Sequence, residues 1–507
     1  MYKAKNQLIA LFTLLCCFTA FADGEVNAEL YPYRHNIAKD HSMRVLNSGI
    51  GSLRARIDLM RRAQETLELE YFIFNTDTAS RIIMREMIAA ADRGVKVRLL
   101  VDKSAAVFVL DEYYAHALRR KNVEVRYYNA ASIIQISTVQ FRNHRKMISR
   151  DGVEAITGGR NIADEYFDLS ETFNFLDRDV WLEGPIVKTM VDSFDKYWAS
   201  DIVEVPARPA KPIKFVGDKV VSYKERQKRN RQHKERVKRH RNRIRESISI
   251  YKPTKKEKKA LNYALSYGKK ALASTDKSIC PHVAFATDRE GGGFAKRVST
   301  QEYHRDFRLL RKEIASWMEL TDREITIDSP YFLNNSRSKE ALHGLLNNKI
   351  TVNILTNSLG STDAIYVATV FSDEVRPYTP SDYFNAYIYT GFFSGESEVM
   401  NEKIKKAVWG THSKTIVFND DAFMIGTFNI DNRSSFYNTE MAIFCKNSKS
   451  LRDDVQNNIE LRMKSSKKLG KNGRPEDGSK LLANSSLTKK MLYFFLKVPA
   501  TLLKFLL

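Results

Sequence analysis

The chain has 507 residues, which exceeds the length at which one hydrophobic core usually stops growing, so a single small domain is excluded and two domains are expected. It carries 82 Lys and Arg against 60 Asp and Glu, and this formal charge of +22 favours anionic partners, either phospholipid surfaces or nucleic acid. Its four cysteines form no CxxC pattern and no cluster with histidine, which argues against a zinc site.

Residues 1–22 match a secretory signal peptide. Lys3 and Lys5 precede an apolar run at 8–21, and Ala20-Phe21-Ala22 before Asp23 is typical of a cleavage site. The alternative is an uncleaved membrane anchor, although the run is short for a membrane span. We therefore expect an exported, membrane-associated protein of the periplasm or cell envelope.

Two cysteines remain after cleavage, Cys280 and Cys445. In an oxidising compartment they could form a disulfide, but the sequence does not show whether they meet.

Residues 45–206 form the first predicted domain. An amphipathic stretch precedes a strand-like segment at 67–74, and a helical pattern at 82–93 is followed by another strand-like segment at 95–101. This alternation of helices and strands predicts an α/β fold.

Residues 207–293 differ in composition and form a basic, largely helical insert or linker. Twelve Lys and Arg stand against two Glu between positions 224 and 245. This helix is either a solvated surface element or a segment that docks on anionic lipid.

Residues 294–465 form the second predicted domain and repeat the pattern of the first. A helix near 341–346 is followed by a strand at 351–356, and a histidine motif lies downstream in both domains. We interpret this as an internal duplication, which predicts two similar domains related by a pseudo-twofold axis. The active site is then expected at their interface.

Residues 466–507 form a tail whose last part, 487–507, mixes leucines and aromatic residues with four lysines. Pro499 is expected to interrupt any continuous helix there. We predict that this segment contacts a membrane interface rather than spanning it. The alternative is a terminal helix that docks on the protein itself.

Both domains contain a histidine and a lysine two positions apart, with an asparagine seventeen positions after the histidine. These residues are His144, Lys146 and Asn161 in the first domain, and His412, Lys414 and Asn429 in the second. In an extended strand each histidine and lysine would share one face, and Arg145 would point to the opposite face. A single such motif would carry little weight, but two copies with matched spacing indicate a site.

Two such faces brought together would supply what displacement at a phosphodiester requires. One histidine can attack phosphorus and form a phosphohistidine, while the other protonates the leaving oxygen and later deprotonates the incoming hydroxyl. The lysine and asparagine side chains would hold the nonbridging oxygens and stabilise the transition state. This chemistry requires no metal and no other cofactor.

The wider motif resembles that of the phospholipase D superfamily. In the first copy the histidine and lysine are followed by Asp151 and by Gly158 and Gly159, and in the second by Gly426 and Thr427. The segments 158–167, 356–363 and 426–434 are similar to the cardiolipin synthase branch. The resemblance implies two phospholipase-D-type α/β/α sandwich domains and a phosphodiesterase or phosphatidyltransferase activity.

The same resemblance implies roles for individual residues. It assigns His144 as the nucleophile and His412 as the general acid and base, although a nearly symmetric site makes this assignment reversible. It also implies that each histidine is oriented by a carboxylate later in the same half, and Asp177 and Glu440 match this role. Asp179 is a rival to Asp177.

The second copy departs from the family pattern at two positions. Asn419 stands where an aspartate is usual, and Thr427 replaces the usual small residue beside the phosphate. These changes predict weakened activity, or a degenerate homologue that only binds phosphate.

Three functions fit these observations. The first is a lipid enzyme that moves a phosphatidyl group from an anionic phospholipid to an alcohol, giving cardiolipin-like products, or to water. The second is a secreted nuclease with the same two-histidine chemistry, since the positive charge also suits nucleic acid. The third is a non-catalytic envelope protein with a vestigial site. The signal peptide, the basic insert and the apolar tail favour the lipid enzyme.

Overall fold

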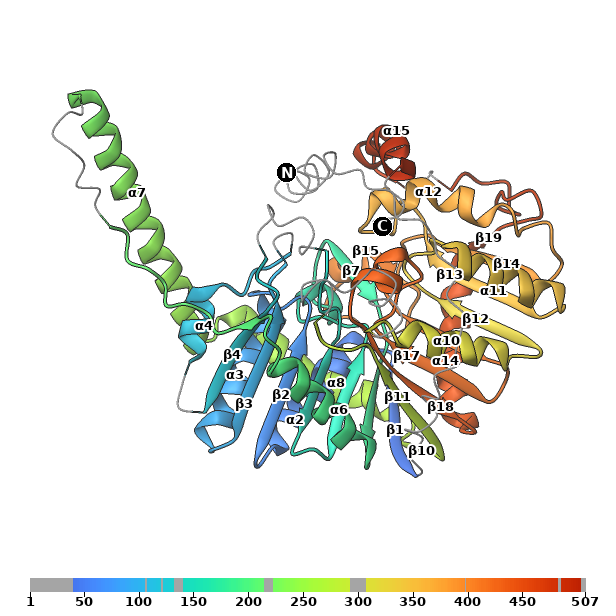
Figure 1. The fold of residues 1–507 in the computed structure, drawn as a ribbon, viewed down its shortest axis with the longest axis horizontal. Helices are drawn as coiled ribbons and strands as arrows, with labels where there is room; N and C mark the ends of the chain where they lie inside the picture. The colour runs from blue at the N-terminus through green and yellow to red at the C-terminus, as the bar shows by residue number, and fades with distance from the viewer. Residues whose placement is uncertain are drawn as a thin grey trace.

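The computed structural model describes residues 40–104, 107–119, 122–131, 140–213, 222–291, 307–396, 398–481 and 485–502. The predicted signal peptide lies outside these residues. The described chain forms two α/β units placed side by side, each built around one large sheet (Figure 1).

The first unit contains a mixed sheet, to which nine strands belong in the described part of the chain. In sheet order they are β10 (Ser278–Cys280), β1 (His41–Leu46), β8 (Asp179–Glu183), β6 (Glu154–Gly158), β5 (Met147–Arg150), β2 (Thr66–Tyr71), β3 (Lys96–Asp102), β4 (Val123–Tyr128) and β9 (Val203–Glu204). Strands β2, β3 and β4 pair in parallel, and the other pairs are antiparallel.

The second unit repeats this arrangement. Its strands lie in the order β11 (His282–Thr287), β18 (Met441–Lys446), β17 (Ala422–Gly426), β16 (Thr415–Phe418), β12 (Glu324–Asp328), β13 (Thr351–Asn357), β14 (Phe384–Tyr389) and β19 (Ser466–Lys468). Its three parallel neighbours, β12, β13 and β14, occupy the same places as β2, β3 and β4 when each order is counted from its last strand, β19 or β9. The predicted duplication and α/β class are confirmed.

The alternating sequence of β2 shows why each sheet is covered on both faces. Leu67, Leu69 and Tyr71 point into the outer hydrophobic core, under helices α2 (Gly49–Arg62) and α3 (Thr78–Asp92). Because successive side chains alternate, Glu68 and Glu70 face the inner side, where both are buried and paired with arginines.

The two units share a third hydrophobic core between their sheets. It contains residues of α6 (Ile186–Trp198) from the first half and of α14 (Lys449–Lys464) from the second. Helix α6 contacts β11 of the second sheet, and α14 contacts β1 of the first sheet. With α10 (Leu310–Glu319) and α11 (Ser336–Asn347) contributing to the outer core of the second unit, both halves are α/β/α sandwiches joined through their inner helices.

The predicted insert at 207–293 is only partly separate from the two domains. Helix α8 (Lys255–Ala273) packs against α2, and strands β10 and β11 extend the two sheets. The boundary therefore needs correction, because residues 255–287 are integral to both units. Tyr263 and Ala264 of α8 lie in the hydrophobic core of the first unit. The polar average composition of residues 207–293 gives no sign of these buried positions.

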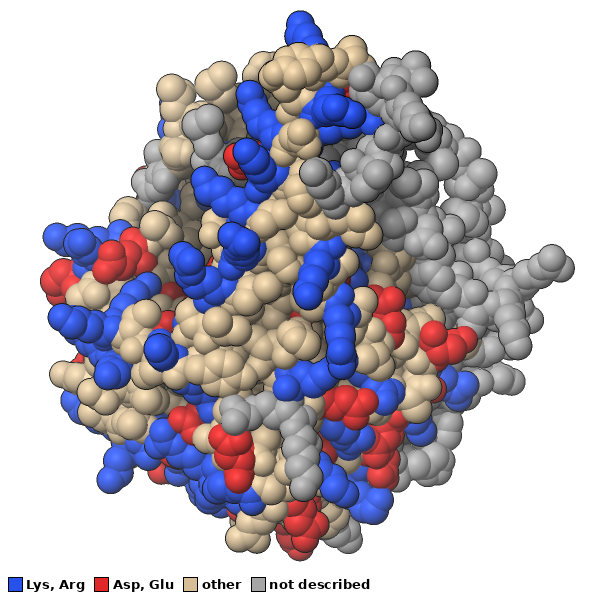
Figure 2. All heavy atoms as spheres, turned by 90° about the vertical axis from the view of Figure 1, so that its left-hand side faces the viewer, with Lys and Arg blue, Asp and Glu red and all other residues tan. Residues whose placement is uncertain are grey.

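The basic part of the insert forms the long helix α7 (Tyr223–Ile248), in which only Ser247 is buried. The C-terminal part of α7 is held to helix α4 (Glu112–Leu118). His240 of α7 contacts Tyr113 of α4, and Arg243 of α7 donates to Asp111, the N-cap of α4. The remainder projects from the body (Figure 1). Lys and Arg outnumber Asp and Glu on this side of the molecule (Figure 2).

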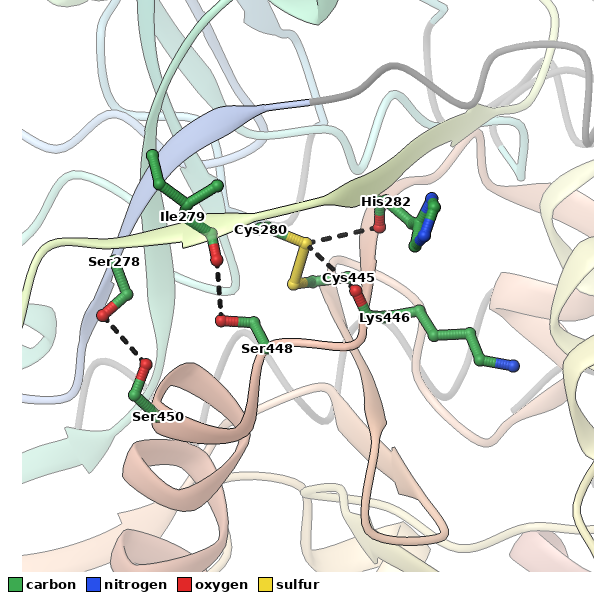
Figure 3. The surroundings of a disulfide bond; sticks show 8 residues. All are labelled: Ser278, Ile279, Cys280, His282, Cys445, Lys446, Ser448 and Ser450. Carbon is green, nitrogen blue, oxygen red and sulfur yellow. Dashed lines mark hydrogen bonds between the residues drawn. A yellow bond between two sulfur atoms is a disulfide. The ribbon is translucent and has the colours of Figure 1, made fainter.

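Cys280 and Cys445 form a disulfide that joins β10 of the first sheet to β18 of the second (Figure 3). Beside it, the Ser448 hydroxyl donates to the Ile279 carbonyl at 2.9 Å, and the Ser450 hydroxyl donates to the Ser278 hydroxyl at 2.9 Å. The bridge therefore lies at a junction of the two units.

Loss of this disulfide should destabilise the protein. The bond closes a loop with a sequence separation of 165 residues, so replacing both cysteines with alanine should lower the free energy of unfolding by about 2–5 kcal/mol. Guanidinium unfolding of the oxidised protein, the reduced protein and the double variant will measure this. Equal midpoints for all three would show that the bridge adds no stability.

The tail forms helix α15 (Leu487–Leu502), which lies against α12 (Ile365–Val375) (Figure 1). The expectation that Pro499 interrupts the helix is wrong. Proline has no N–H to donate to the carbonyl of Phe495, but Phe495 is 73% exposed, so water can satisfy that carbonyl. Within the described residues, no helix has the length and apolarity needed to cross a membrane.

Candidate active site

The two histidine motifs meet at the interface between the units. The four side chains are almost completely buried: His144 is 7%, Lys146 1%, His412 5% and Lys414 1% exposed. They do not lie within regular strands as expected but in the short segments that lead into β5 and β16. Each ammonium group donates to the carbonyl of the histidine two positions earlier.

Backbone pairing between the halves places each histidine. Strand β15 (Val408–Thr411) runs parallel to β7 (Phe173–Leu176), and the His412 amide donates to the Leu176 carbonyl at 2.8 Å. In the same way, the His144 amide donates to the Thr439 carbonyl at 3.0 Å. Each histidine thus lies opposite the residue that precedes a carboxylate of the other half.

The carboxylates therefore act across the interface. His144 Nδ1 lies 2.9 and 3.0 Å from the two Glu440 oxygens, and His412 Nδ1 lies 2.6 Å from Asp177 Oδ2. The expectation that each carboxylate orients the histidine of its own half is wrong, because the segments that carry them cross to the partner half. With Nδ1 engaged, Nε2 is the ring nitrogen that faces the chemistry.

The rival carboxylate, Asp179, has a different role. Its Oδ2 accepts hydrogen bonds from Ser52 at 2.6 Å, Arg56 at 2.9 Å and Arg160 at 3.2 Å. All four side chains are buried in the first unit, so Asp179 stabilises an internal ionic cluster rather than a histidine.

The two histidine–carboxylate pairs differ in their surroundings. A side chain at Gly159 would place its Cβ 2.1 Å from Asp177 Oδ1, so the short aspartate needs a glycine beside it. At the matching position Thr427 donates its hydroxyl to Glu440 at 2.5 Å, and its carbonyl lies 3.1 Å from His144 Nδ1. The longer glutamate thus accommodates the threonine that departs from the family pattern.

Steric crowding also explains why glycine precedes each of these two positions, at Gly158 and Gly426. Gly158 has a φ of +156°, and an added Cβ would lie 2.4 Å from the Arg178 carbonyl. At Gly426 an added Cβ would lie 2.5 Å from both Ala442 and the Met441 carbonyl. These close approaches let β6 and β17 pair directly with β8 and β18, the strands that follow the two carboxylates.

The two pairs differ in the electrostatics of their carboxylates, since the pKa of His412 is lowered as well, by burial and by Lys414. Burial, together with the positive charges of Lys146 and Lys414, lowers the pKa of His144 well below its usual value, while burial raises the pKa of Glu440 to about 7. Burial alone would also raise the pKa of Asp177, but its contact with His412 lowers it to about 2. Asp177 is therefore ionised at neutral pH, whereas His144 is neutral there and Glu440 is partly protonated.

The two motif asparagines are buried but have different partners. Asn161 Oδ1 accepts from the Ile73 amide at 3.1 Å, and its Nδ2 donates to the Tyr166 hydroxyl at 2.9 Å. Asn429 Oδ1 is buried without a hydrogen-bond partner in the described part of the chain. An amide oxygen that lacks a partner can accept a hydrogen bond from a donor group of a ligand.

Several neighbours of the site were missed by sequence reasoning. The ring of Tyr166 lies 5.1 Å from that of His412, and the ring of Phe72 lies 5.1 Å from that of His144. Ser434 donates its hydroxyl to Glu440 at 2.7 Å. Tyr166 and Ser434 each stand five positions after the motif asparagine, and this common offset could have indicated that both lie near the site.

No group of three or more His, Cys, Asp or Glu side chains in the described residues could hold a metal ion.

Comparison with known families decides the assignment. A family model described as "Cardiolipin synthase, PLD-like domain" matches residues 57–198 and 314–461, which together make up more than half of the chain. The chain belongs to this phospholipase D family. It is accordingly an enzyme of the phosphodiesterase and phosphatidyltransferase type.

Individual relatives are similar to this chain over most of its length. An uncharacterized protein of Helicobacter pylori strain 26695 is 27% identical over 442 residues, covering 82% of this chain and 79% of the relative. Cardiolipin synthase C of Escherichia coli K12 is 27% identical over 428 residues, covering 78% and 79%. The crystal structure of phosphatidylserine synthase from Haemophilus influenzae shares the fold, with a TM-score of 0.60, 14% identity and coverage of 94% and 99%.

The phospholipase D motif continues at Asp151, which supports the turn after β5 rather than the reacting groups. Its carboxylate accepts from the backbone amides of Gln64, Glu65 and Thr66 at 2.8–3.2 Å. Asn419 accepts from the amides of the matching segment, residues 322–324, at 3.1–3.5 Å. Both residues have positive φ, so asparagine preserves the turn. Asn419 lies five extended residues, about 16 Å, from Lys414.

The residue between histidine and lysine differs between the two phospholipase D motifs. Arg145 pairs with Glu70 at 3.1 Å and lies 3.8 Å from the ring centre of Tyr197 in α6. It therefore extends toward the inner helix, as expected for the face opposite His144. In the second motif the small Ser413 occupies this position and supplies no cation.

A cation of the first half takes that place in the second motif. Arg178, next to Asp177, donates to the Ser413 hydroxyl at 3.0 Å and to the Thr415 hydroxyl at 2.8 Å, and lies 3.4 Å from Asp328. The first half thus supplies both the carboxylate at His412 and the arginine behind it.

Anion binding by this phospholipase D site should weaken as pH rises. Burial lowers the pKa of Lys146 to about 7 and that of Lys414 to about 8, so both lose their protons far below the usual 10.5. Sulfate keeps its charge in this range, and its inhibition constant should rise from pH 7 upward by about tenfold per pH unit for each lysine that must stay charged.

Inhibition by sulfate, measured from pH 6 to 9, tests this expectation. In Lys146→Met the binding should be weaker at low pH, and the step that begins near pH 7 should disappear. A constant affinity across the range in the unchanged protein would contradict the assignment of the lysines to anion binding.

Proposed function

We propose that this enzyme is a phosphatidyltransferase that moves a phosphatidyl group from an anionic phospholipid to an alcohol through a phosphohistidine, giving cardiolipin-like products. The observation that carries the proposal is the pair of buried histidines, each held through Nδ1 by a carboxylate of the other half, with a lysine beside each. This arrangement suits a two-step displacement at a phosphodiester.

In the first step, Nε2 of His144 attacks phosphorus, and the bond from phosphorus to the leaving glycerol oxygen breaks. The proton on Nε2 of His412 passes to that oxygen, so the alcohol leaves as a neutral molecule. The lowered pKa of His144 suits the nucleophilic role because the ring must be neutral to attack, but the pKa of His412 is lowered too, so the assignment rests on the different carboxylates beside the two rings.

In the second step, neutral His412 removes a proton from the incoming hydroxyl, whose oxygen attacks phosphorus. The bond between phosphorus and His144 Nε2 then breaks and regenerates the enzyme. The ionised Asp177 beside His412 supports this acid and base role, because a carboxylate at 2.6 Å stabilises the imidazolium form.

Lys146 and Lys414 would bind the nonbridging oxygens in both steps, and Asn161 and Asn429 would orient the phosphate. In a site sheltered from water, such donors stabilise the developing charge without reorganisation.

We also propose that the protein works outside the cytoplasm, on an anionic membrane. The disulfide supports an oxidising compartment, as does the signal-like sequence at residues 1–22. The projecting basic helix α7 and the basic face of the molecule favour an anionic surface (Figure 2). Each basic side chain near such a surface contributes about 1 kcal/mol.

The first experiment incubates purified residues 23–507 with phosphatidylglycerol vesicles and, separately, with DNA. Lipid products are followed by mass spectrometry and DNA length on a gel. Cardiolipin together with free glycerol is the expected result. Phosphatidic acid alone would identify a hydrolase, DNA cleavage would identify the nuclease, and no product from either would favour the vestigial site.

A further inference from the structure

Helix α15 exposes an apolar stripe on the side that does not pack against α12. Leu487 is 74%, Met491 54%, Phe494 68% and Phe495 73% exposed. Their spacing of four, three and one positions places them on one side of the helix. Four large apolar side chains exposed together indicate an interaction surface.

The charge of the helix identifies the partner that fits this stripe. The sequence 487–502 contains no Asp or Glu but includes Lys489, Lys490 and Lys497. Apolar side chains that enter the acyl boundary, on a helix with basic and no acidic residues, suit an anionic phospholipid bilayer. Binding of a nucleic acid backbone would leave the apolar stripe exposed to water. Helix α15 also rises from the same side of the molecule as the free end of α7 (Figure 1).

One lysine of α15 connects the helix to the body. Lys489 Nζ donates to the carbonyl oxygens of Leu359 at 3.2 Å, Gly360 at 3.0 Å and Thr362 at 2.8 Å. Three acceptors account for all the protons of one ammonium group, so a single side chain holds the loop at residues 359–362.

The same loop supports the strand that leads to His412. A Cβ at Gly410 would lie 2.1 Å from the Ser361 carbonyl, which shows how closely the loop and β15 approach. Just before the loop, the side chain of Asn357 accepts from the Thr411 amide at 2.9 Å and donates to the Thr411 carbonyl at 2.7 Å. His412 follows directly, so packed and hydrogen-bonded groups connect α15 to a catalytic histidine.

We propose that α15 docks on an anionic bilayer and that docking, acting through Lys489, holds the loop at residues 359–362 and strand β15 more firmly in the position that favours catalysis at His412. Docking itself does not depend on the reaction. The catalytic consequence rests on the proposed function, and it makes the enzyme more active on a membrane surface than on dispersed substrate.

The docking surface is tested with Met491→Gln/Phe494→Gln/Phe495→Gln, which changes only exposed side chains. Sedimentation with vesicles of equal phosphatidylcholine and phosphatidylglycerol content should show binding weakened by about tenfold or more. The control is Val153→Gln/Leu320→Gln, which changes two exposed residues outside α15 and should bind as the unchanged protein does. Unchanged vesicle binding by the triple variant overturns the docking proposal. The proposal is also overturned if the triple variant loses self-association instead of vesicle binding.

The connection is tested with Lys489→Met, which keeps the apolar stem but removes the three hydrogen bonds. This variant should bind vesicles normally, lose about tenfold in turnover on vesicles, and retain its turnover on a dispersed short-chain phospholipid. Lys480→Met, an exposed lysine that precedes the helix, should behave as the unchanged protein does. Full vesicle turnover in Lys489→Met overturns the connection.

The two proposals fail in different ways. If the unchanged protein acts on no lipid but the triple variant still loses vesicle binding, the proposed function is wrong and α15 remains a docking element. If the unchanged protein makes lipid products and neither variant differs from it, the proposed function stands and the role of α15 is wrong.

Discussion

Replacement of His144 with alanine is expected to reduce turnover by about 10⁴-fold or more while the protein stays folded. The change removes the nitrogen that attacks phosphorus. His144 lies in a short segment before β5 and contributes no apolar side chain to the three hydrophobic cores, so thermal unfolding should change little. Rates of lipid product formation and a melting curve measure the two effects.

His412→Asn is the matched variant that separates the two histidines. It should form a phosphatidylated His144 from a substrate with a good leaving group and then release it slowly, because no base activates the incoming alcohol. Intact-mass measurement at neutral pH, where phosphohistidine survives, detects this species. Label on His412 in the His144→Ala protein would reverse the assignment, and full activity in His144→Ala would overturn the mechanism.

Asp177→Asn should reduce turnover of a natural phospholipid by about 10³–10⁴-fold, although Asp177 and His412 belong to different halves. The variant leaves a side chain of the same size but removes the charge that supports the imidazolium form of His412 at 2.6 Å. Loss of the acid should matter less when the leaving group needs no proton. With a phosphatidyl nitrophenol as substrate, the first step should therefore recover most of its rate.

Glu440→Gln is the control for this experiment, because Glu440 contacts His144 rather than His412. Its loss should be similar with both leaving groups, since the nucleophile is needed in each case. The opposite pattern, with Glu440→Gln rescued and Asp177→Asn not, would show that the carboxylates serve the histidines of their own halves in the working enzyme.

Some features of the fold could be predicted because they depend on local sequence. The alternation of Leu67, Leu69 and Tyr71 with Glu68 and Glu70 predicts a strand covered on both faces, and the structure contains it as β2. The basic segment at 224–245 has no apolar face, and it forms an exposed helix. Such patterns follow from the period of the backbone and require no distant partner.

Other features could not be predicted because distant segments decide them. Helix α8 and strands β10 and β11 look like parts of a polar linker, yet they complete the two units. Helix α15 continues through Pro499, where sequence patterns predict a break, and it packs against α12. For α8, β10 and β11, tertiary packing overrides a local preference of modest size.

The sequence by itself determined the duplication, the α/β class and the two histidine–lysine motifs, because a repeated spacing of reactive residues is visible without coordinates. Only the tertiary structure decided how the motifs share their carboxylates. His412 and Asp177 are 235 positions apart, and their contact depends on the pairing of β7 with β15 across the interface. No local period records such a pairing, since it arises only when the two sheets pack through their inner helices.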